Sequence, residues 1–293
     1  MPDGEPRSGA RPAGRRVAIG TFDGVHVGHR EVIDGNDTVL TFDPHPLSVI
    51  RPEAAPRLVM PFAIKRDVIA GLGVEELVVV PFDHEFSRRS AEDFADRVLV
   101  GQLGAQSVSV GENFRFGQGA RGTAGFLRSR PEFETRVVPL VEVTGETVSS
   151  SHIRGLVAAG EVEKAARFLG GPYMLEGEVV HGDKRGRELG YPTANVVPAD
   201  ELVSPGHGVY AAWANGHPAA VNVGVRPTFE TGRGLLVEAY LIDFEGDLYG
   251  QGLRIAFVQR LRGEKRFESV KELVAQMGRD VEQARRILAQ VAC

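Results

Sequence analysis

The pattern of apolar and polar positions changes character about halfway along the chain. In the first half, short apolar runs alternate with segments of helical spacing. The segment 90–104 opens with a Ser-x-x-Asp cap, and the run 76–82 is so continuously apolar that it predicts a strand covered on both faces. This alternation predicts a parallel sheet with right-handed crossovers. The predicted strands are 16–20, 38–42, 76–82, 106–111 and 135–140, and the predicted helices are 62–73 and 90–104.

Two short helices follow within residues 151–173, separated by Gly160 and ended by the Gly-Gly-Pro sequence at 170–172. Glycine commonly ends helices because it adopts the left-handed backbone without steric cost. We place a domain boundary here. The predicted organisation is a disordered tail at 1–16, a first domain at 17–170 and a second at 171–293.

The second half is rich in short apolar runs separated by Gly, Pro and Asp, which predicts an antiparallel barrel or sandwich. A capping box at Ser269 and Glu272 then opens a helix with one apolar stripe, which we expect to pack on that sheet. The predicted strands are 176–183, 193–198, 208–214, 218–224, 235–244 and 253–261. The predicted stripe is Val270, Leu273, Val274, Met277, Val281, Ala284, Ile287 and Leu288.

Composition narrows the class of protein. The formal net charge is −5, which gives no case for a nucleic-acid partner, although local basic patches can bind small anions. The one cysteine, Cys293, excludes a disulfide framework and fits a reducing cytoplasm. No apolar run is long enough for a membrane span or a secretory signal. The sequence carries no signal for an oligomeric state.

The stretch GTFDGVHVGH at 20–29 is the first that suggests chemistry. It follows a predicted strand of a parallel sheet, where ligands commonly bind, and the next helix is expected to begin near His29. Gly24 and Gly28 permit close approach of the backbone, and His26 and His29 can donate hydrogen bonds to a phosphate. A metal-binding pair and two structural histidines in a turn remain alternatives.

A second glycine-rich stretch, HGDKRGRELGYPTANV at 181–196, follows a predicted strand of the second half. It forms a basic loop that can cover phosphates, although it lacks the ending of a Walker A motif. Thr193 and Asn195 supply hard oxygen ligands suited to Mg²⁺ with a triphosphate. Glu238 lies among apolar neighbours in a strand and can act as a general base for an alcohol. An ordinary turn and a solvent-facing glutamate are the alternatives.

The HxGH motif after an apolar strand resembles the nucleotidylyltransferase superfamily. SSSHIR at 149–154 is similar to its downstream Ser-Ser-x-x-Ile-Arg signature, which implies that Ser150, Ser151 and Arg154 hold pyrophosphate. An ordinary helix cap is the alternative for the serines. TFDPHP at 41–46 and GENFRFG at 111–117 resemble the flavin adenylyltransferase branch.

The second half contains GDKRGRELGYPTAN, NVGVRPTF, VEAYLIDFEGDLYG and LRGEKRF, which look like riboflavin kinase in linear order. The whole chain from about Val17 resembles the bacterial bifunctional riboflavin kinase/FAD synthetase family. That resemblance implies a Rossmann-like nucleotidylyltransferase domain with a parallel sheet, then an antiparallel β-barrel with a terminal helix.

The resemblance implies two reactions with ATP, riboflavin and FMN as substrates and Mg²⁺ as cofactor. Riboflavin is phosphorylated in the second domain, where Glu238 accepts the proton, and FMN is adenylylated in the first. Phe42, Phe114 and Phe116 can border flat rings, and a place in the hydrophobic core is the alternative for each. The implied catalytic residues are Glu238, His26 and His29, and the implied ligands of the metal ion are Thr193 and Asn195. The residues implied to bind flavin are Phe42, Asp43, Phe114 and Arg226. The residues implied to bind ATP and phosphates are Gly20, Phe22, Gly24, Gly28, Asn113, Ser150, Ser151, Arg154, Gly182, Gly186, Gly190, Thr193 and Asn195.

One departure from the family concerns the crossover after His29, which is shorter by a couple of helical turns. A helix of REVI alone is expected to leave part of the sheet uncovered and the phosphate-binding helix weakly supported. Two alternatives to the bifunctional enzyme therefore stand. One is a riboflavin kinase whose N-terminal domain only binds or assembles, and the other is a flavin-binding regulator without turnover.

Overall fold

The computed structural model describes residues 14–181, 190–226 and 234–291 of the 293 in the chain. These residues form two compact units. The first comprises the described residues up to Phe22, with Gly28–Ala55 and Arg66–Val141. The second comprises Asp23–Val27, Pro56–Lys65 and the chain from Glu142 onward. The predicted domain boundary at 170/171 stays a prediction.

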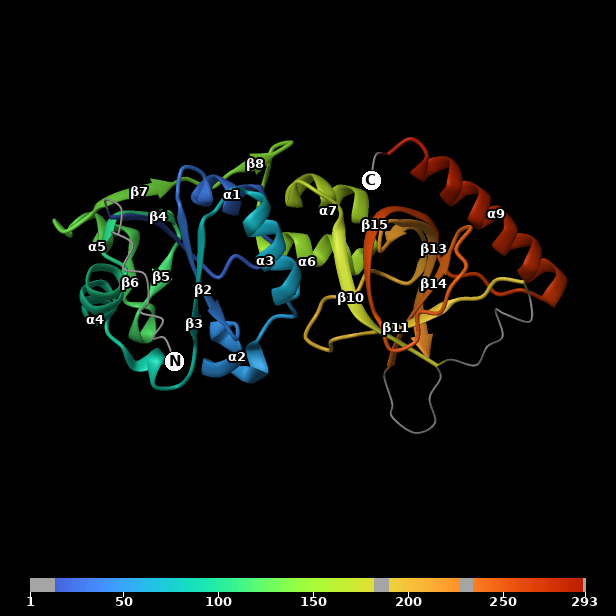
Figure 1. Ribbon diagram of the computed structural model, residues 1–293, viewed down its shortest axis with the longest axis horizontal. Coiled ribbons are helices and arrows are strands. Elements are labelled where there is room, and N and C mark those ends of the chain that lie inside the picture. The colour runs from blue at the N-terminus through green and yellow to red at the C-terminus, as the bar shows by residue number, and fades with distance from the viewer. Residues whose placement is uncertain (1–13, 182–189, 227–233, 292–293) are drawn as a thin grey trace, which may run out of the picture. The chain divides into compact units, whose positions relative to one another are not determined.

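The first unit is built on a five-stranded sheet in the order β3-β2-β1-β4-β7, and every neighbouring pair is parallel (Figure 1). This confirms the predicted fold class of the first half. The strands are β1 (Arg15–Ile19), β2 (Thr38–Asp43), β3 (Glu76–Pro81), β4 (Ala105–Gly111) and β7 (Glu134–Val138).

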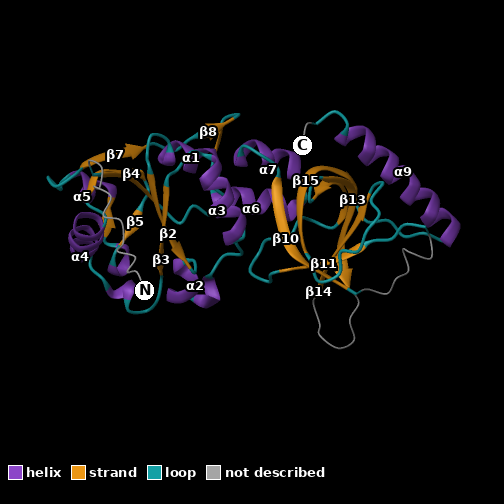
Figure 2. Ribbon diagram, in the orientation of Figure 1, coloured by secondary structure: helices purple, strands orange, loops and turns teal. Residues whose placement is uncertain are grey.

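Helices and short hairpins connect these strands (Figure 2). The predicted helix at 90–104 forms with Ser90 as its cap, since the Ser90 hydroxyl accepts a hydrogen bond from the Asp93 N–H, but most of it is a π-helix. The helices are α1 (Val27–Ile33), α2 (Pro46–Ile50), α3 (Phe62–Gly71), α4 (Ala91–Asp93), its π-helical continuation (Phe94–Gln102) and α5 (Ala124–Arg128). The hairpin of this unit pairs β5 (Arg115–Phe116) with β6 (Gly122–Thr123), and a second hairpin, β8 (Glu142–Val143) with β9 (Glu146–Thr147), follows β7 and belongs to the second unit.

Two expectations about this sheet can be compared with the structure, and the first of them is wrong. Strand β3 lies at its edge and is half exposed, with Val79 at 36% exposure, so its apolar run does not mark a strand covered on both faces. The short crossover after His29 does not leave its neighbouring strands uncovered. Strands β1 and β2 on either side of it are buried, with Val17, Val39 and Leu40 at 0% exposure.

Helices α6 (Ser150–Ala159) and α7 (Val162–Leu169) are the pair predicted between the two halves. Gly160 and Gly170 cap them in the left-handed conformation, as expected. The strands that follow close into a six-stranded barrel in the order β10-β11-β14-β13-β12-β15, with every described pairing antiparallel. The barrel strands are β10 (Tyr173–Val180), β11 (Ala194–Pro198), β12 (Gly208–Ala214), β13 (His217–Arg226), β14 (Gly234–Leu241) and β15 (Gly252–Arg262).

Helix α9 (Val270–Leu288) packs on the outside of the barrel through Ala284 and Leu288, as its stripe predicts. Its cap is the predicted one, because the Ser269 hydroxyl accepts from the Glu272 N–H at 3.2 Å. The stripe does not hold at its first position, since Val270 is 62% exposed.

Candidate active sites

The parallel sheet has a switch point between β1 and β4. From β1 the chain proceeds to β2 and β3 on one side, and it then returns to β4 and β7 on the other. Ligands of open α/β sheets bind at the carboxyl ends of strands at such a point. Gly20 and Phe22 directly follow β1, and Asn113 lies exposed in the turn after β4. Topology therefore places these three predicted residues at one end of neighbouring strands.

The loop after β1 has an unusual backbone. Phe22, Gly24 and Val25 have φ angles of 49°, 89° and 39°, in the left-handed region that β-branched residues rarely adopt. Helix α1 begins at Val27, slightly earlier than predicted, and His29 lies in its first turn. The Phe22 ring meets the His29 ring edge-on at 5.3 Å between centroids. Such strain at the end of a sheet strand is typical of functional loops.

His26 is 6% exposed, and this burial lowers its pKa to about 4. The ring is therefore neutral at pH 7 and can offer one N–H to a ligand rather than a positive charge. Gly24 is also buried. A Cβ at this position would lie 3.0 Å from the Val59 side chain, so packing as well as backbone conformation requires glycine here.

Asp23 is a residue that the sequence interpretation did not single out. It is 4% exposed, its carboxylate accepts the Val59 N–H at 2.8 Å, and burial raises its pKa. The Arg154 guanidinium lies 3.6 Å from the other carboxylate oxygen. The Ser150 hydroxyl donates to the Asp23 carbonyl at 2.9 Å. The sequence signal that could have identified Asp23 is a carboxylate in the glycine-rich loop after the first strand.

Three consecutive serines at the start of α6 have different roles. Ser149 is the helix cap, because its hydroxyl accepts a hydrogen bond from the His152 N–H. The alternative of an ordinary helix cap is therefore confirmed for this serine. Ser151 accepts a hydrogen bond from Arg154 at 3.1 Å. The structure thus brings Ser150, Ser151 and Arg154 together around Asp23.

Phe42 and Phe116 are 7% and 8% exposed and belong to the core of the first unit. Phe42 contacts the Phe82 ring edge-on at 5.8 Å. Phe114 is partly buried and stacks on Phe116 at 5.4 Å, and Asp43 is exposed at the end of β2. Contact of these residues with flavin stays a prediction.

Strand register brings three polar side chains into one row in the barrel. Glu238 on β14 pairs directly with Asn195 on β11 and with Asn222 on β13. The Asn222 side-chain amide donates to a Glu238 carboxylate oxygen at 3.2 Å, and Asn195 is buried. Thr193 directly precedes β11. Asn222 was missed because its pairing with Glu238 depends on strand register.

Some predicted site residues of the barrel cannot be placed in this row. Gly182, Gly186 and the side chain of Arg226 lie outside the described residues. Gly190 is exposed, with a φ of 85°. Across the described chain, no group of three or more His, Cys, Asp and Glu side chains is arranged to hold a metal ion.

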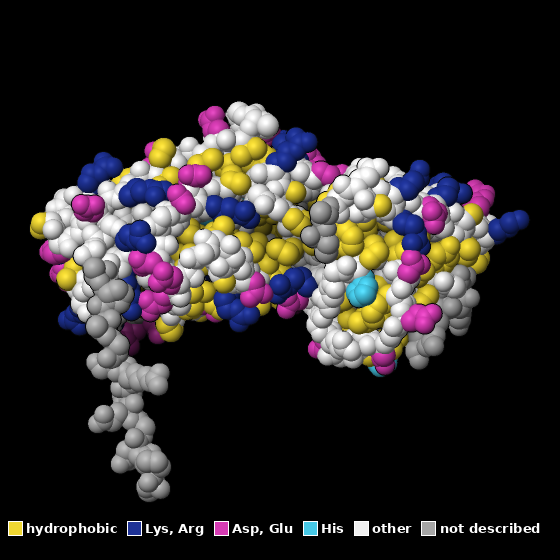
Figure 3. All heavy atoms as spheres, turned by 45° about the horizontal axis from the view of Figure 1, so that its top comes forward, with side chains coloured by type: hydrophobic (Ala, Val, Ile, Leu, Met, Phe, Trp, Pro, Cys, Tyr) yellow, Lys and Arg dark blue, Asp and Glu magenta, His cyan; other side chains and the backbone are white. Residues whose placement is uncertain are grey.

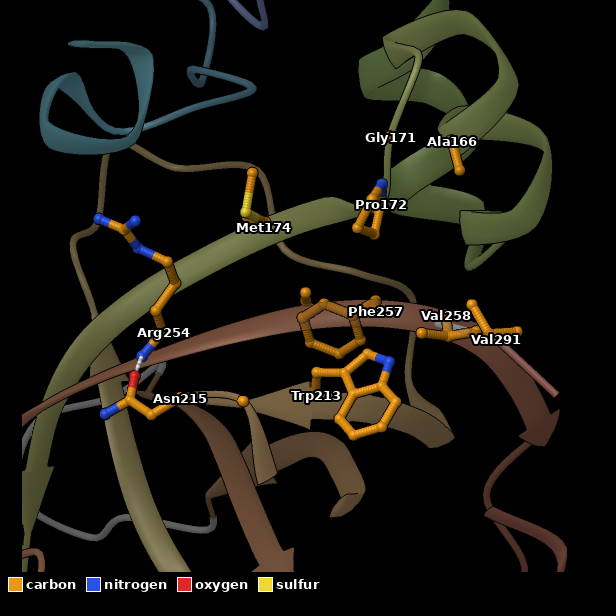
Figure 4. Close-up of a pocket in the computed structure, with 12 residues that line it drawn as sticks. Ala166, Gly171, Pro172, Met174, Trp213, Asn215, Arg254, Phe257, Val258 and Val291 are labelled. Atoms are coloured by element: carbon orange, nitrogen blue, oxygen red, sulfur yellow. Dashed lines mark hydrogen bonds between the residues drawn. The ribbon is translucent and has the colours of Figure 1, made fainter. Parts of the chain in front are cut away.

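A cavity of about 690 Å³ lies elsewhere in the second unit (Figure 4). Trp213, Phe257 and Met174 line it, with Asn215 and Arg254 at one side, and no predicted site residue is among its lining residues. On the face of the described residues in Figure 3, basic and acidic side chains are interspersed. In the described part of the chain, no helix is long and apolar enough to cross a membrane.

Two family models match the chain. A FAD synthetase model covers residues 9–152, and a riboflavin kinase model covers residues 169–288. The chain is 36% identical to the bifunctional riboflavin kinase/FMN adenylyltransferase of Listeria monocytogenes, over 94% of this chain and 93% of that protein. The same-named protein of Bacillus subtilis is 35% identical over the same shares. A crystal structure titled macrolide-efflux protein, from Streptococcus pneumoniae, is 31% identical with a TM-score of 0.84, covering 94% of this chain and 95% of that one.

Proposed function

Since the chain belongs to the bifunctional riboflavin kinase/FMN adenylyltransferase family, we propose which of its residues carry the two reactions. The enzyme phosphorylates riboflavin to FMN with ATP, and it adenylylates FMN to FAD with release of pyrophosphate. The kinase-only alternative is not supported, because the FAD synthetase match spans the first half of the chain. A location in the cytoplasm is a proposal supported by the single cysteine.

Glu238 is the general base of the kinase reaction, and the observation that carries this proposal is its row with Asn195 and Asn222. The terminal ribityl hydroxyl of riboflavin attacks the γ-phosphorus of ATP. A new O–P bond forms, the bond to the β-phosphate oxygen breaks, and ADP leaves. The hydroxyl proton passes to Glu238. Because Asn222 donates to one carboxylate oxygen, the other oxygen stays available for that proton.

The residues beside Glu238 fit a magnesium site of the kind that binds a metal–nucleotide complex. Mg²⁺ favours oxygen ligands, and it commonly keeps substrate phosphates and water in its coordination shell rather than a complete set of protein ligands. Thr193 and Asn195 would hold it by their side-chain oxygens, and Asn195 is already paired with the Glu238 strand. When bound, the ion neutralises charge on the phosphates of ATP.

The adenylyl transfer uses the loop after β1 and the start of α6. The FMN phosphate attacks the α-phosphorus of ATP and pyrophosphate leaves, so no strong base is needed because the nucleophile is already an anion. His26 and His29 donate hydrogen bonds to the reacting phosphate. Ser150, Ser151 and Arg154 hold the departing pyrophosphate. Positioning and electrostatics supply most of the rate.

The test is to incubate the enzyme with riboflavin, ATP and Mg²⁺ and to separate the flavins by chromatography. Wild type should yield FMN and FAD. Glu238→Gln should lower the kinase kcat about 10² to 10⁴-fold, while the variant still binds riboflavin and still converts supplied FMN to FAD. Glu178→Gln, an exposed glutamate of β10, is the matched control and should keep wild-type activity. Wild-type FMN formation by Glu238→Gln would refute the role of Glu238.

A further inference from the structure

Asp23 is held in place by contacts to two distant parts of the chain. One carboxylate oxygen, Oδ1, accepts the Val59 N–H at 2.8 Å, and the Asp23 backbone carbonyl accepts the Ser150 hydroxyl at 2.9 Å. The side chain is therefore held by the backbone at Val59, and the backbone of Asp23 is held by the first turn of α6. A carboxylate fixed in this way can act on its surroundings without moving.

The second carboxylate oxygen, Oδ2, is buried and makes no hydrogen bond within the described chain. Its nearest cation is the Arg154 guanidinium, whose Nη2 atom at 3.6 Å is beyond good hydrogen-bond distance. The Nε atom of Arg154 is likewise buried without a hydrogen bond in the described chain. A buried carboxylate and a partly buried guanidinium that attract each other, yet leave these two atoms without a hydrogen bond, are poorly arranged for stability alone.

The cations near Asp23 favour an anion as the further partner of the Arg154 guanidinium. Arg154 and the buried Lys65 both act electrostatically on the carboxylate. A bare carboxylate would repel a polyphosphate, whereas a carboxylate paired with Arg154 can hold the guanidinium in place while its other N–H groups bind the anion.

We infer that Asp23 is a positioning residue for pyrophosphate, which fixes the Arg154 guanidinium by charge, while its backbone carbonyl, which accepts the Ser150 hydroxyl, ties the loop after β1 to the start of α6. The inference deepens the proposed function and rests on the assignment of Arg154 to the departing pyrophosphate. Asp23 itself touches neither substrate. Two groups hold the Arg154 guanidinium. Ser151 contacts its Nη1 atom, and the Asp23 carboxylate attracts its Nη2 atom.

The reverse reaction tests this directly, because pyrophosphate is then a substrate with its own KM. The enzyme is given FAD, Mg²⁺ and inorganic pyrophosphate, and ATP and FMN are measured. Asp23→Asn keeps an oxygen for the Val59 N–H but removes the charge. We expect its KM for pyrophosphate to rise about tenfold while its KM for FAD stays within about twofold, in line with the loss of one charge-assisted contact. Asp243→Asn, which breaks an exposed ion pair with Arg285 in the same unit, should behave as wild type.

A double-mutant cycle separates this inference from the proposed function. If Asp23 acts through Arg154, then Asp23→Asn should add little to the effect of Arg154→Gln. Fully additive effects of the two substitutions on the pyrophosphate KM would overturn the positioning role and leave the role of Arg154 intact. An unchanged pyrophosphate KM in Arg154→Gln alone would overturn the role of Arg154 and the inference with it.

Two further readouts exclude other roles for Asp23. Riboflavin kinase activity of the same preparations reports the fold of the second unit, and Asp23→Asn should keep it. Parallel loss of kinase and reverse activity would mean that Asp23 merely holds the fold, which overturns the inference. An Asp23→Asn defect that excess Mg²⁺ repairs would assign the carboxylate to the cation instead, and it would also overturn the inference.

Discussion

His26 should make the stability of the second unit depend on pH in a defined direction. Burial lowers its pKa to about 4 from an ordinary value of 6.5. The folded state therefore binds this proton less readily than the unfolded chain does. The stabilising effect is fully present above pH 6.5, and it is lost as the pH falls toward 4.

The size of this effect follows from the two pKa values. One pKa unit corresponds to about 1.4 kcal/mol, so the whole difference is worth about 3 kcal/mol. Because most of the titration of unfolded histidine lies between pH 7 and pH 5, about 2 kcal/mol should be lost over that interval. Carboxylates add their own pH dependence at lower pH, so only the difference between wild type and a histidine variant isolates this term.

Urea unfolding of wild type and His26→Gln at pH 7 and pH 5 measures that difference. Trp213 is the only tryptophan of the chain and belongs to the same compact unit as His26, so its fluorescence reports the relevant transition. Wild type should lose about 2 kcal/mol more than His26→Gln. His217→Gln, which changes an exposed histidine, should lose as much as wild type. Equal losses in wild type and His26→Gln would refute the assignment of His26 as a buried, neutral group.

Two other substitutions test the barrel. Asn222→Leu removes the hydrogen-bond donor to Glu238. Because a hydrogen bond to a charged group is worth about 1.5–3 kcal/mol, the kinase kcat should fall about tenfold or more in the flavin chromatography assay. An unchanged kcat would contradict the role given to Asn222. Asp280→Ala removes a buried carboxylate that binds Arg262 at 2.8 Å, so urea unfolding should show a loss of about 3–5 kcal/mol, whereas Asp243→Ala at an exposed pair should change the stability far less. Equal losses in these two variants would contradict the burial argument.

The sequence predicted the features that depend on local signals. Ser90, Ser149 and Ser269 cap helices because each is followed by a suitable helical turn, and this is visible within four residues. The spacing of apolar runs predicted the parallel sheet and an antiparallel barrel or sandwich, and the family resemblance favoured the barrel. Strand β3 misled the prediction, because an apolar run does not reveal whether a strand lies inside a sheet or at its edge.

Residues whose roles depend on distant contacts escaped the sequence interpretation. Asn222 meets Glu238 only because β13 and β14 pair in one particular register. Asp23 meets Val59 and Arg154, which are 36 and 131 positions further along the chain. Neither meeting leaves a periodic pattern in the sequence. The predicted site residues therefore came from motifs, whereas the side chains that position them came from the fold.

The short crossover after His29 is compatible with adenylyl transfer. The connection is shortened at the end that lies away from the site. His29 lies in the first turn of α1, near the carboxyl end of β1, whereas the segment after Ile33 leads to the amino-terminal end of the neighbouring strand β2, at the opposite end of the strands. Hydrogen bonds from side chains, rather than additional helical turns, hold that end of the connection in place.

Asn36 is one of those side chains, because its amide donates to the carbonyl groups of Val32 and Ile33 at 3.0 and 3.2 Å. Arg136 on β7 is another, since its guanidinium donates to the Asp34 carbonyl at 2.9 Å. These contacts satisfy the carbonyl groups that a short helix leaves open at its end. The geometry of the loop after β1 is set by the strand before it, so a helix of seven residues suffices to place His29.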